Sequence, residues 1–382
     1  MSTTEQKQEL KQAKRIVIKI GSSTLTDAQG NIDAAYIDGL ATQIQTLRAQ
    51  GSQVIIVTSA AISAGLQALG MPPKRPRSIP ILQAAAAVGQ IELAKVYADA
   101  FLKKGIKVGQ ILLTRLEIEN RISYLHARDT IEKLLELGVI PLINENDTVA
   151  VDEIRFGDND TLAAQVSILI RADLTILLSD IEGFYAADPR IDEDAELLRT
   201  VGSFTEEIVK AAGEAGSLRG SGGMVTKIEA ARMLMAAGIP MVLCEGHKEN
   251  AVLDAAVGKH VGTMFGQGII KHHAGARKLW MALGGSVKGV VYIDDGAVKA
   301  LREQGSSLLP VGVQRVAGVF EAGRAVNIRA HDGFLIGRGL SNYSSEELAL
   351  AAGLKSSELA LNKKLEHLAN IEVIHRDQMV VF

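Results

Sequence analysis

Short apolar runs alternate with longer amphipathic stretches through residues 15–265. The runs are rich in Ile, Val and Leu, which is typical of parallel strands that are covered on both faces. We expect strands at Arg15–Ile20, Gln53–Thr58, Lys107–Leu113, Val139–Ile143, Leu174–Leu178 and Ile239–Leu243.

The stretches between these strands repeat apolar residues at spacings of three and four. Within Ala34–Gln50, for example, Ile37, Leu40, Ile44 and Leu47 fall on one side of a helix. Regular alternation of strand and helix predicts an α/β fold, a three-layer αβα arrangement around a mainly parallel sheet. The other predicted helices are Ile81–Lys104, Ile122–Leu137, Thr161–Arg171 and Thr226–Ala237.

The pattern changes near residue 277, where helical stretches shorten and glycine recurs. We predict a small, mostly β barrel over residues 277–382, a linker over residues 261–276, the αβα domain over residues 15–260 and a polar tail over residues 1–14. The strand candidates of the barrel are Val287–Ile293, Arg315–Phe320, Ala325–Ala330, Phe334–Arg338 and Met379–Phe382, with a helix at Ser344–Ala352.

Composition narrows the class of protein. The 382 residues exceed one ordinary hydrophobic core, which agrees with two domains. A formal net charge of −3 provides no field that would draw the chain to nucleic acid or to an anionic membrane. The single cysteine, Cys244, excludes an internal disulfide and is expected to be a buried small hydrophobe. With no secretory signal and no long apolar span, we expect a cytoplasmic protein.

Polar side chains gather in residues 143–161, directly after the predicted strand Val139–Ile143. This stretch reads INENDTVAVDEIRFGDNDT and includes Asp147, Asp158 and Asp160. Because open α/β sheets bind ligands beyond the carboxyl ends of their strands, we predict a binding site here. An acidic surface loop is the alternative interpretation.

A first small-residue loop, Lys19–Thr24 with the sequence KIGSST, follows the first strand. Backbone N–H groups around Gly21 and the neighbouring hydroxyl groups suit phosphate oxygens, and Lys19 adds a positive charge. It is not a Walker A loop, because its lysine precedes the glycine.

A second loop, Val57–Gly65 with the sequence VTSAAISAG, follows the second strand. Its small side chains allow a ligand to approach the backbone, and Ser59 can donate a hydrogen bond to a ligand carboxylate. A helix is expected to begin here, so the alternative role of Ser59 is that of a plain helix N-cap.

A third loop, Ser217–Lys227 with the sequence SLRGSGGMVTK, places glycines before a helix that has Lys227 in its first turn. A glycine-rich turn at a helix N-terminus suits a polyphosphate. Ser179 and Asp180, which follow the strand Leu174–Leu178, are expected to line the same nucleotide pocket.

The motifs KIGSST, VTSAAISAG, INEND with GDND, SDIEGFYAADPR and SGGMVTK together resemble the amino acid kinase family, and within it the glutamate 5-kinases. The ending, GRGLSNYSSEEL followed by EVIHRD, resembles a PUA domain, a small β module typical of RNA-modifying proteins. The resemblance runs from about Arg15 to the end of the chain. It implies an amino acid kinase fold followed by a PUA-like domain.

The resemblance also implies a reaction, in which ATP phosphorylates the side-chain carboxylate of L-glutamate to L-glutamyl 5-phosphate, the first step of proline biosynthesis. A carboxyl group with a pKa of about 4.3 is already ionised at pH 7, so no general base is needed. The reaction needs two anions to be aligned and the charge on the phosphoryl oxygens to be neutralised.

The residue roles carried over from the family fall into three groups. The catalytic group comprises Lys19, Asp160 and Lys227, in which Asp160 organises the two lysines. The residues that bind glutamate are Ser59, Asp147, Asp158 and Asn159. The nucleotide-binding residues are Lys19, Gly21, Ser179, Asp180, Ser221, Gly222, Gly223, Met224, Val225, Thr226 and Lys227.

The family further implies cofactors and partners. Mg²⁺ is expected to bridge the β- and γ-phosphates of ATP with mostly water ligands, so the metal ligands in the protein are unknown. Proline is the expected inhibitor, glutamate-5-semialdehyde dehydrogenase is a possible partner, and a homo-oligomer, dimer or tetramer, is expected. Whether the PUA-like domain binds RNA stays open.

Two other functions compete with this one. The first is another member of the same family, acting on N-acetylglutamate, aspartate or a nucleoside monophosphate; the INEND loop and the PUA-like tail argue against it. The second is an RNA-binding PUA protein with a vestigial kinase fold; residues 277–382 lack the dense basic stripe with interleaved aromatics that would favour it. The chain departs from the family at Ala60, where glycine is common, and at Ser179, where threonine is frequent.

Overall fold

The computed structural model describes residues 13–27, 29–72, 76–150, 159–187, 192, 194–205, 208, 223–266 and 287–382. The chain divides into two compact units. The first comprises Met1–Met235 and Ile239–Ile270, and the second comprises Lys271–Phe382 with the short segment Ala236–Gly238. Each unit is described by itself.

The first unit is built on a sheet whose strand order, within the described residues, is β3-β4-β2-β1-β5-β7-β8-β6. All neighbours pair in parallel except β7 and β8, which are antiparallel. This confirms the predicted mainly parallel sheet. The strands are β1 (Arg15–Ile20), β2 (Gln53–Val57), β3 (Val108–Leu113), β4 (Ile140–Glu145), β5 (Leu174–Ser179), β6 (Thr200–Val201), β7 (Met241–Glu245) and β8 (Gly262–Phe265).

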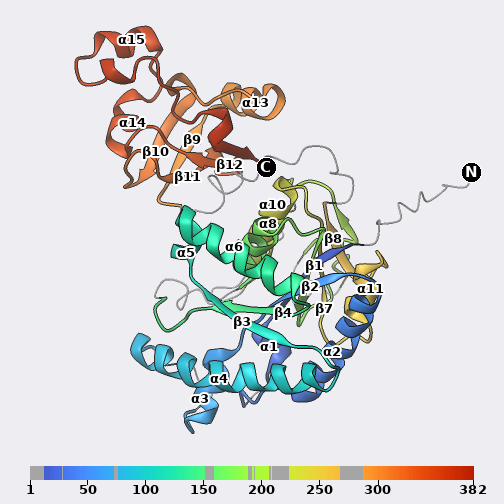
Figure 1. Cartoon of the computed structure of the whole chain (residues 1–382). Helices are drawn as coiled ribbons and strands as arrows, with labels where there is room; N and C mark the ends of the chain where they lie inside the picture. Colours follow the sequence, from blue (N-terminus) through green and yellow to red (C-terminus); the bar gives the residue numbers. More distant parts are fainter. Residues whose placement is uncertain are drawn as a thin grey trace, which may run out of the picture. The chain divides into compact units, whose positions relative to one another are not determined.

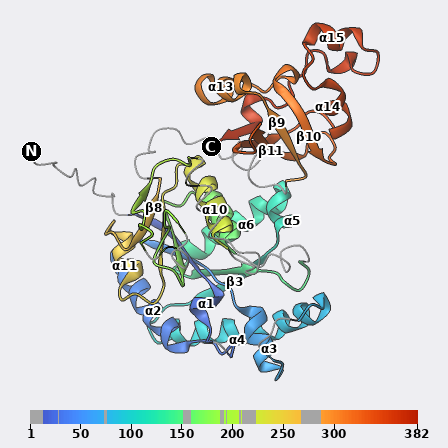
Figure 2. The ribbon, with the colours of Figure 1, turned by 180° about the vertical axis from the view of Figure 1, so that it is seen from behind.

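Helices cover both faces of this sheet, which confirms the αβα arrangement. Figures 1 and 2 show α2, α4 and α11 along one face and α6 and α10 along the other, where α8 contacts β1 and β5. The helices of the first unit include α1 (Ser22–Leu25), α2 (Ala34–Ala49), α3 (Ala61–Ala68), α4 (Ile79–Leu102), α5 (Arg115–Glu119), α6 (Arg121–Glu136), α8 (Asp160–Leu169), α10 (Met224–Ala236) and α11 (Ala251–Ala256).

Strand β1 shows how the sequence assigns side chains to the two faces. Successive residues of a strand point to opposite faces of the sheet. Ile16, Ile18 and Ile20 pack into the core cluster that includes residues of α2 and α4. Val17 and Lys19 therefore face the opposite side, which α8 covers.

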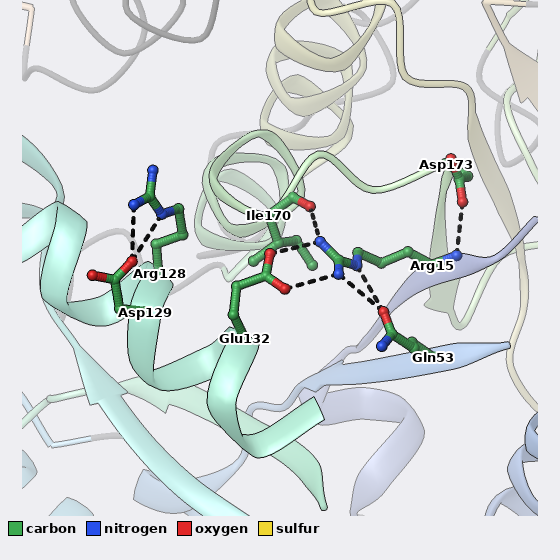
Figure 3. A network of polar contacts seen from close by, with 7 residues as sticks. All are labelled: Arg15, Gln53, Arg128, Asp129, Glu132, Ile170 and Asp173. Carbon is green, nitrogen blue, oxygen red and sulfur yellow. Dashed lines mark hydrogen bonds and ion pairs between the residues drawn. The ribbon is translucent and has the colours of Figure 1, made fainter. Parts of the chain in front are cut away.

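Arg15 begins β1 and holds several elements together at this end of the sheet (Figure 3). Its Nη1 and Nη2 donate to both carboxylate oxygens of Glu132 on α6, at 2.7 and 2.8 Å. Nη1 also donates to the carbonyl of Ile170, directly after α8, at 2.6 Å. Gln53 Oε1 on β2 accepts from Nε and Nη2 at 3.1 and 3.0 Å. One side chain thus links β1, β2, α6 and the end of α8.

Helix α4 is unusually long and apolar. It spans 24 residues, and its length and composition alone would allow it to cross a membrane, which corrects the expectation that no long apolar span is present. It is the one such helix in the described parts of the chain. The core helix of a soluble protein passes the same test, so this finding is weak evidence for a membrane. Leu93, Tyr97 and Phe101 on its inner face are fully buried.

Five elements of the first unit, α1, α5, α11, β6 and β8, were not expected from the sequence. Gly262–Phe265 lies in the segment predicted to be a linker, but it forms β8 between β7 and β6. A four-residue strand that begins with glycine carries too little alternation to be recognised before its partner is known. Helices α5 and α11 were missed because they are too short to show a helical period.

The second unit contains a five-stranded sheet of order β10-β9-β11-β12-β13 within the described residues. This confirms a separate, mostly β unit at the end of the chain. Helix α13, which was not expected, begins where the Asp294 side chain accepts from the backbone N–H of Ala297 at 2.7 Å. The elements are β9 (Gly289–Ile293), α13 (Asp295–Gln304), β10 (Val313–Gly318), β11 (Ala325–Ala330), β12 (Leu335–Leu340), α14 (Ser345–Ala351), α15 (Ser356–Leu361) and β13 (Met379–Val381), with 3₁₀ turns at Pro310–Gly312, Glu366–Leu368 and Arg376–Gln378.

Candidate active site

The candidate site lies where four neighbouring strands end. In the sheet order β4-β2-β1-β5, each strand runs parallel to the next, so all four carboxyl ends meet at one edge. The register places Lys19 of β1 beside Val57 of β2 and Leu177 of β5. The loops that leave β1, β2 and β4 carry Gly21, Ser59 and Asp147, and β5 ends at Ser179; the sequence had assigned these residues to one site.

Asp160 is the centre of this site. Its Oδ1 lies 2.6 Å from Lys19 Nζ, and its Oδ2 lies 3.1 Å from Lys227 Nζ. The Asp160 side chain is fully buried, and the two lysine side chains are only 4% and 9% exposed. Three ionised groups are therefore brought together out of water, although 141 positions separate Lys19 from Asp160 and 67 separate Asp160 from Lys227.

The fold explains why these groups meet. Lys19 faces the side of β1 that α8 covers, and Asp160 is the first residue of α8. A carboxylate in the first turn of a helix is stabilised by the helix dipole. Lys227 lies at the end of the first turn of α10, and Thr226 Oγ1 contacts both Asp160 Oδ2, at 3.1 Å, and the Gly223 carbonyl, at 2.8 Å. Asp160 therefore joins β1, α8 and α10.

Two ammonium groups lie close together at one carboxylate. Coulomb interactions are stronger in a buried site than in bulk water, so two neighbouring cations favour an anion at this edge of the sheet. The beginnings of α8 and α10 add partial positive charge at the same place.

The chain leaves β1 two residues after Lys19, at Gly21. The Gly21 N–H donates to the Leu178 carbonyl at 3.2 Å, and the one-turn helix α1 begins at Ser22. A side chain placed at Gly21 would begin 3.8 Å from Lys19 Nζ. The glycine thus keeps the space beside the lysine open for a ligand.

The predicted nucleotide-binding residues lie on two elements. Ser179 ends β5, where its Oγ lies 3.1 Å from Asp180 Oδ1, and Gly223–Lys227 form the start of α10. Ser221 and Gly222 lie outside the described residues. The Ser179 carbonyl accepts from the Gly246 N–H at 2.8 Å, so the loop after β7 adjoins this side of the site, which the sequence did not indicate.

Ser59 lies between β2 and α3. It is not the N-cap of α3, which corrects the alternative role considered for it: the N-cap is Ala60, and no side chain caps this helix. Ala60 adopts a left-handed backbone with φ 78° and ψ 5°. That conformation explains why glycine would suit this position, because a Cβ is disfavoured there.

The remaining predicted substrate residues approach from β4 and α8. Asp147 is half-buried in the turn after β4. Asn159 precedes α8 and is buried, and its Nδ2 donates to the Asn144 Oδ1 at 2.7 Å and to the Thr58 carbonyl. Asp158 lies outside the described residues. Asn159 is thus a fixed, buried amide beside Ser59.

Several contacts in this region were not predicted. Gln90 on α4 accepts from Asn144 Nδ2 at 2.7 Å, and Tyr97 Oη on the same helix lies 3.1 Å from Thr58 Oγ1. The signal available in the sequence was Gln90, one of two glutamines in the largely apolar α4, which the helical period alone does not distinguish from a surface residue. Cys244 is fully buried on β7, and burial raises the pKa of its thiol to about 12, which fits a small core residue.

A comparison with known protein families decides the class of this site. The amino acid kinase family matches residues 14–245, the part of the chain that carries all of these residues. The chain belongs to the amino acid kinase family. The PUA domain matches residues 289–360, within the second unit.

The most similar curated members of the amino acid kinase family that we found are glutamate 5-kinases. The chain is 46% identical to the enzyme of Geobacter sulfurreducens, over 97% of this chain and 98% of the relative. It is 45% identical to that of Pelobacter propionicus, over 96% and 97% of the two chains. A solved structure of UMP kinase from Ureaplasma parvum covers 66% of this chain and 97% of its own at 17% identity, with a TM-score of 0.45, which is too low to support an argument.

Proposed function

We propose that this member of the amino acid kinase family transfers the γ-phosphoryl group of ATP to the side-chain carboxylate of L-glutamate and so begins proline biosynthesis. The observation that carries the proposal is the buried Asp160, which holds Lys19 and Lys227 at 2.6 and 3.1 Å at the carboxyl edge of the sheet. The near full-length similarity to glutamate 5-kinases supports the choice of acceptor.

In the proposed reaction, a carboxylate oxygen of glutamate attacks the γ-phosphorus in line. The new O–P bond forms as the bond to the β,γ-bridging oxygen breaks, and ADP leaves. No proton moves, because the acceptor is already ionised. Lys19 and Lys227 neutralise charge on the transferring group from two sides, while Asp160 holds both ammonium groups in place.

The two substrates are proposed to occupy different sides of this group. ATP, with its Mg²⁺ bound mainly through phosphates and water, lies toward Ser179, Asp180 and the start of α10. No group of three or more metal-ligating side chains occurs among the described residues. Glutamate lies toward Ser59, Asp147 and Asn159, whose oxygens accept hydrogen bonds from its α-ammonium group or donate to its carboxylate.

We further propose a cytoplasmic homo-oligomer in which proline, the cyclised end product, competes for the glutamate site. Asp147→Ala should then raise the KM for glutamate by roughly tenfold or more, because an acceptor for the ammonium group is lost. It should also raise the proline concentration that halves the rate. Initial rates measured over a grid of glutamate and proline concentrations test both effects. A raised KM with unchanged proline sensitivity would show that the two sites are separate.

The assay that tests the activity itself is ATP turnover with trapping of the acyl phosphate by hydroxylamine. We expect hydroxamate to form with glutamate and not with aspartate or N-acetylglutamate. Hydroxamate with either of the latter alone would assign the chain to another branch of the family. RNA retention on a filter with a steep salt dependence, together with no ATP turnover, would instead favour a PUA protein with a vestigial kinase fold.

A further inference from the structure

We propose that Gln90 of α4 is a positioning residue for the amino-acid side of the site: it holds a chain of amides that turns the Asn159 carbonyl oxygen toward the substrate. The inference rests on the proposed glutamate site and adds a residue that lies outside every motif of the sequence. It also accounts for a buried polar side chain in an otherwise apolar helix.

The chain of amides consists of three side chains from three elements. Gln90 Oε1 on α4 accepts from Asn144 Nδ2 on β4 at 2.7 Å. Asn144 Oδ1 accepts from Asn159 Nδ2 at 2.7 Å. All three side chains are buried, with exposed fractions of 9%, 2% and 9% respectively. Water therefore does not substitute easily for a missing partner.

Two backbone groups determine the orientation of the side-chain amides of Asn144 and Asn159. The Glu145 N–H, which can only donate, donates to Asn144 Oδ1 at 2.9 Å. The Thr58 carbonyl, which can only accept, accepts from Asn159 Nδ2. An amide oxygen and nitrogen are otherwise nearly interchangeable in shape, so these contacts settle the orientation. Asn144 must then present its nitrogen to α4, where only an acceptor such as Gln90 Oε1 satisfies it.

The orientation has a chemical consequence at the substrate. Both N–H bonds of Asn159 Nδ2 are used, by Thr58 and by Asn144. The remaining polar atom of this side chain is Oδ1, which only accepts. A site with a fixed acceptor here selects a donor, such as the α-ammonium group of glutamate. A rotated Asn159 would offer an N–H in the same place and repel that group.

Helix α4 is well placed to hold this chain. Gly89 packs so closely against α3 that a Cβ there would come within 1.9 Å of the Ala61 carbonyl and 2.4 Å of the Gly65 nitrogen. Tyr97, two turns beyond Gln90 and on the same face, reaches Thr58 Oγ1 at 3.1 Å. The helix is thus locked against both the start of α3 and the loop after β2.

Gln90 stabilises the fold less than an apolar side chain of similar size would. Its Nε2 is buried and has no hydrogen-bond partner among the described residues. A buried donor without a partner is destabilising, and an apolar side chain of similar size would avoid that cost. A glutamine that serves only the core would therefore be replaced by Met without loss, whereas a positioning glutamine would not.

The test compares Gln90→Met, Gln90→Glu and the control Glu92→Met, which changes an exposed residue of the same helix. Gln90→Met removes the acceptor for Asn144, so the KM for glutamate should rise roughly tenfold. The KM for ATP should stay within about twofold. The unfolding midpoint should change little, because one buried donor without a partner, Gln90 Nε2, is exchanged for another, Asn144 Nδ2. Gln90→Glu keeps an acceptor oxygen and should restore the glutamate KM. Glu92→Met should match the unchanged protein.

A wild-type glutamate KM in Gln90→Met would overturn the inference, as would an equal rise of both KM values that Gln90→Glu does not restore. Crystal structures of the unchanged protein and of Gln90→Met provide a readout that does not depend on activity. The Asn144–Asn159 contact should be kept in the first and lost in the second, and its survival in both would also overturn the inference. Absence of any glutamate-dependent turnover by the unchanged protein would instead refute the proposed function.

Discussion

The two ends of strand β1 carry ion-pair networks that differ in kind. At the carboxyl end, Lys19 meets Asp160 at the start of α8, with exposed fractions of 4% and 0%. At the amino end, Arg15 meets Glu132 and the carbonyl that ends α8, with exposed fractions of 22% and 35% for the ion pair (Figure 3). Both cations lie on the same face of one strand, yet one end is buried and the other is partly in water.

The lengths of β1 and α8 explain why two side chains of one strand contact the two ends of one helix. The four steps from Arg15 to Lys19 span about 13 Å at the usual rise of a strand. The nine steps from Asp160 to Leu169 span about 13.5 Å at the usual rise of a helix. Helix α8 runs antiparallel to β1 along this face. Lys19 therefore reaches the carboxylate of Asp160 at the beginning of the helix, and Arg15 reaches the carbonyl of Ile170 at its end.

The two networks differ as expected for a structural network at the amino end and the proposed catalytic network at the carboxyl end. Arg15 is paired with Glu132, and its other side-chain hydrogen bonds go to Gln53 and to the carbonyl of Ile170. The network around Asp160 is more deeply buried, and removing three ionised groups from water costs stability. Sites that violate the rules of stable packing are expected where a protein functions.

The largest predicted effect comes from removing the centre of the carboxyl-end network. Asp160→Asn leaves two buried ammonium groups without their carboxylate. We expect kcat to fall on the order of 10³-fold and the free energy of unfolding to fall by about 3 kcal/mol. Steady-state kinetics and denaturant unfolding measure the two quantities.

Asp129→Asn is the matched control, since Asp129 pairs with Arg128 on the exposed surface of α6 (Figure 3). Its free energy of unfolding should change by less than about 0.5 kcal/mol, with kcat unchanged. Equal effects of the two substitutions would contradict the special role assigned to Asp160.

A much smaller effect is predicted at two left-handed residues, one near each end. Ala60 precedes α3 with φ 78°, and Arg171 follows α8 with φ 53°. Glycine at either position relieves backbone strain, so Ala60→Gly and Arg171→Gly should each raise the free energy of unfolding by about 0.5 kcal/mol. Only Ala60→Gly, which adjoins Ser59, should also shift the KM for glutamate. A gain at Arg171 with a loss at Ala60 would mean that the Ala60 conformation is not strained.

The sequence predicted the fold correctly where the local spacing of apolar residues shows which positions are buried. The bounds of β1 agree residue for residue with the expected strand, because its apolar run begins after two basic residues, Lys14 and Arg15, and ends before Gly21. Strand β8 could not be foreseen, since Gly262–Phe265 becomes a strand only by pairing with β7. The close contact of α3 and α4 through Gly65 and Gly89 likewise depends on long-range geometry.

The candidate site was predicted where its residues stand in sequence motifs and was missed where they stand in a helix without a motif. Lys19, Asp160 and Lys227 stand in motif loops, so their residue types and order identify them, and the structure brings them together. Gln90 stands in a helix. The spacing of apolar residues in that helix shows which positions are buried, but it does not show which hydrogen bonds the Gln90 amide makes. Thr226 was expected to bind the nucleotide, and the structure places its hydroxyl 3.1 Å from Asp160.

The most direct test of this difference replaces each cation of β1 by methionine, which is unbranched and uncharged. We predict that Lys19→Met lowers kcat for glutamate on the order of 10²-fold, with little change in unfolding, because Asp160 keeps Lys227. We predict that Arg15→Met keeps kcat within about twofold but lowers the free energy of unfolding by about 2 kcal/mol, because a bidentate pair and a helix-end contact are lost. Full activity in Lys19→Met, or an equal loss of kcat in both variants, would contradict the account.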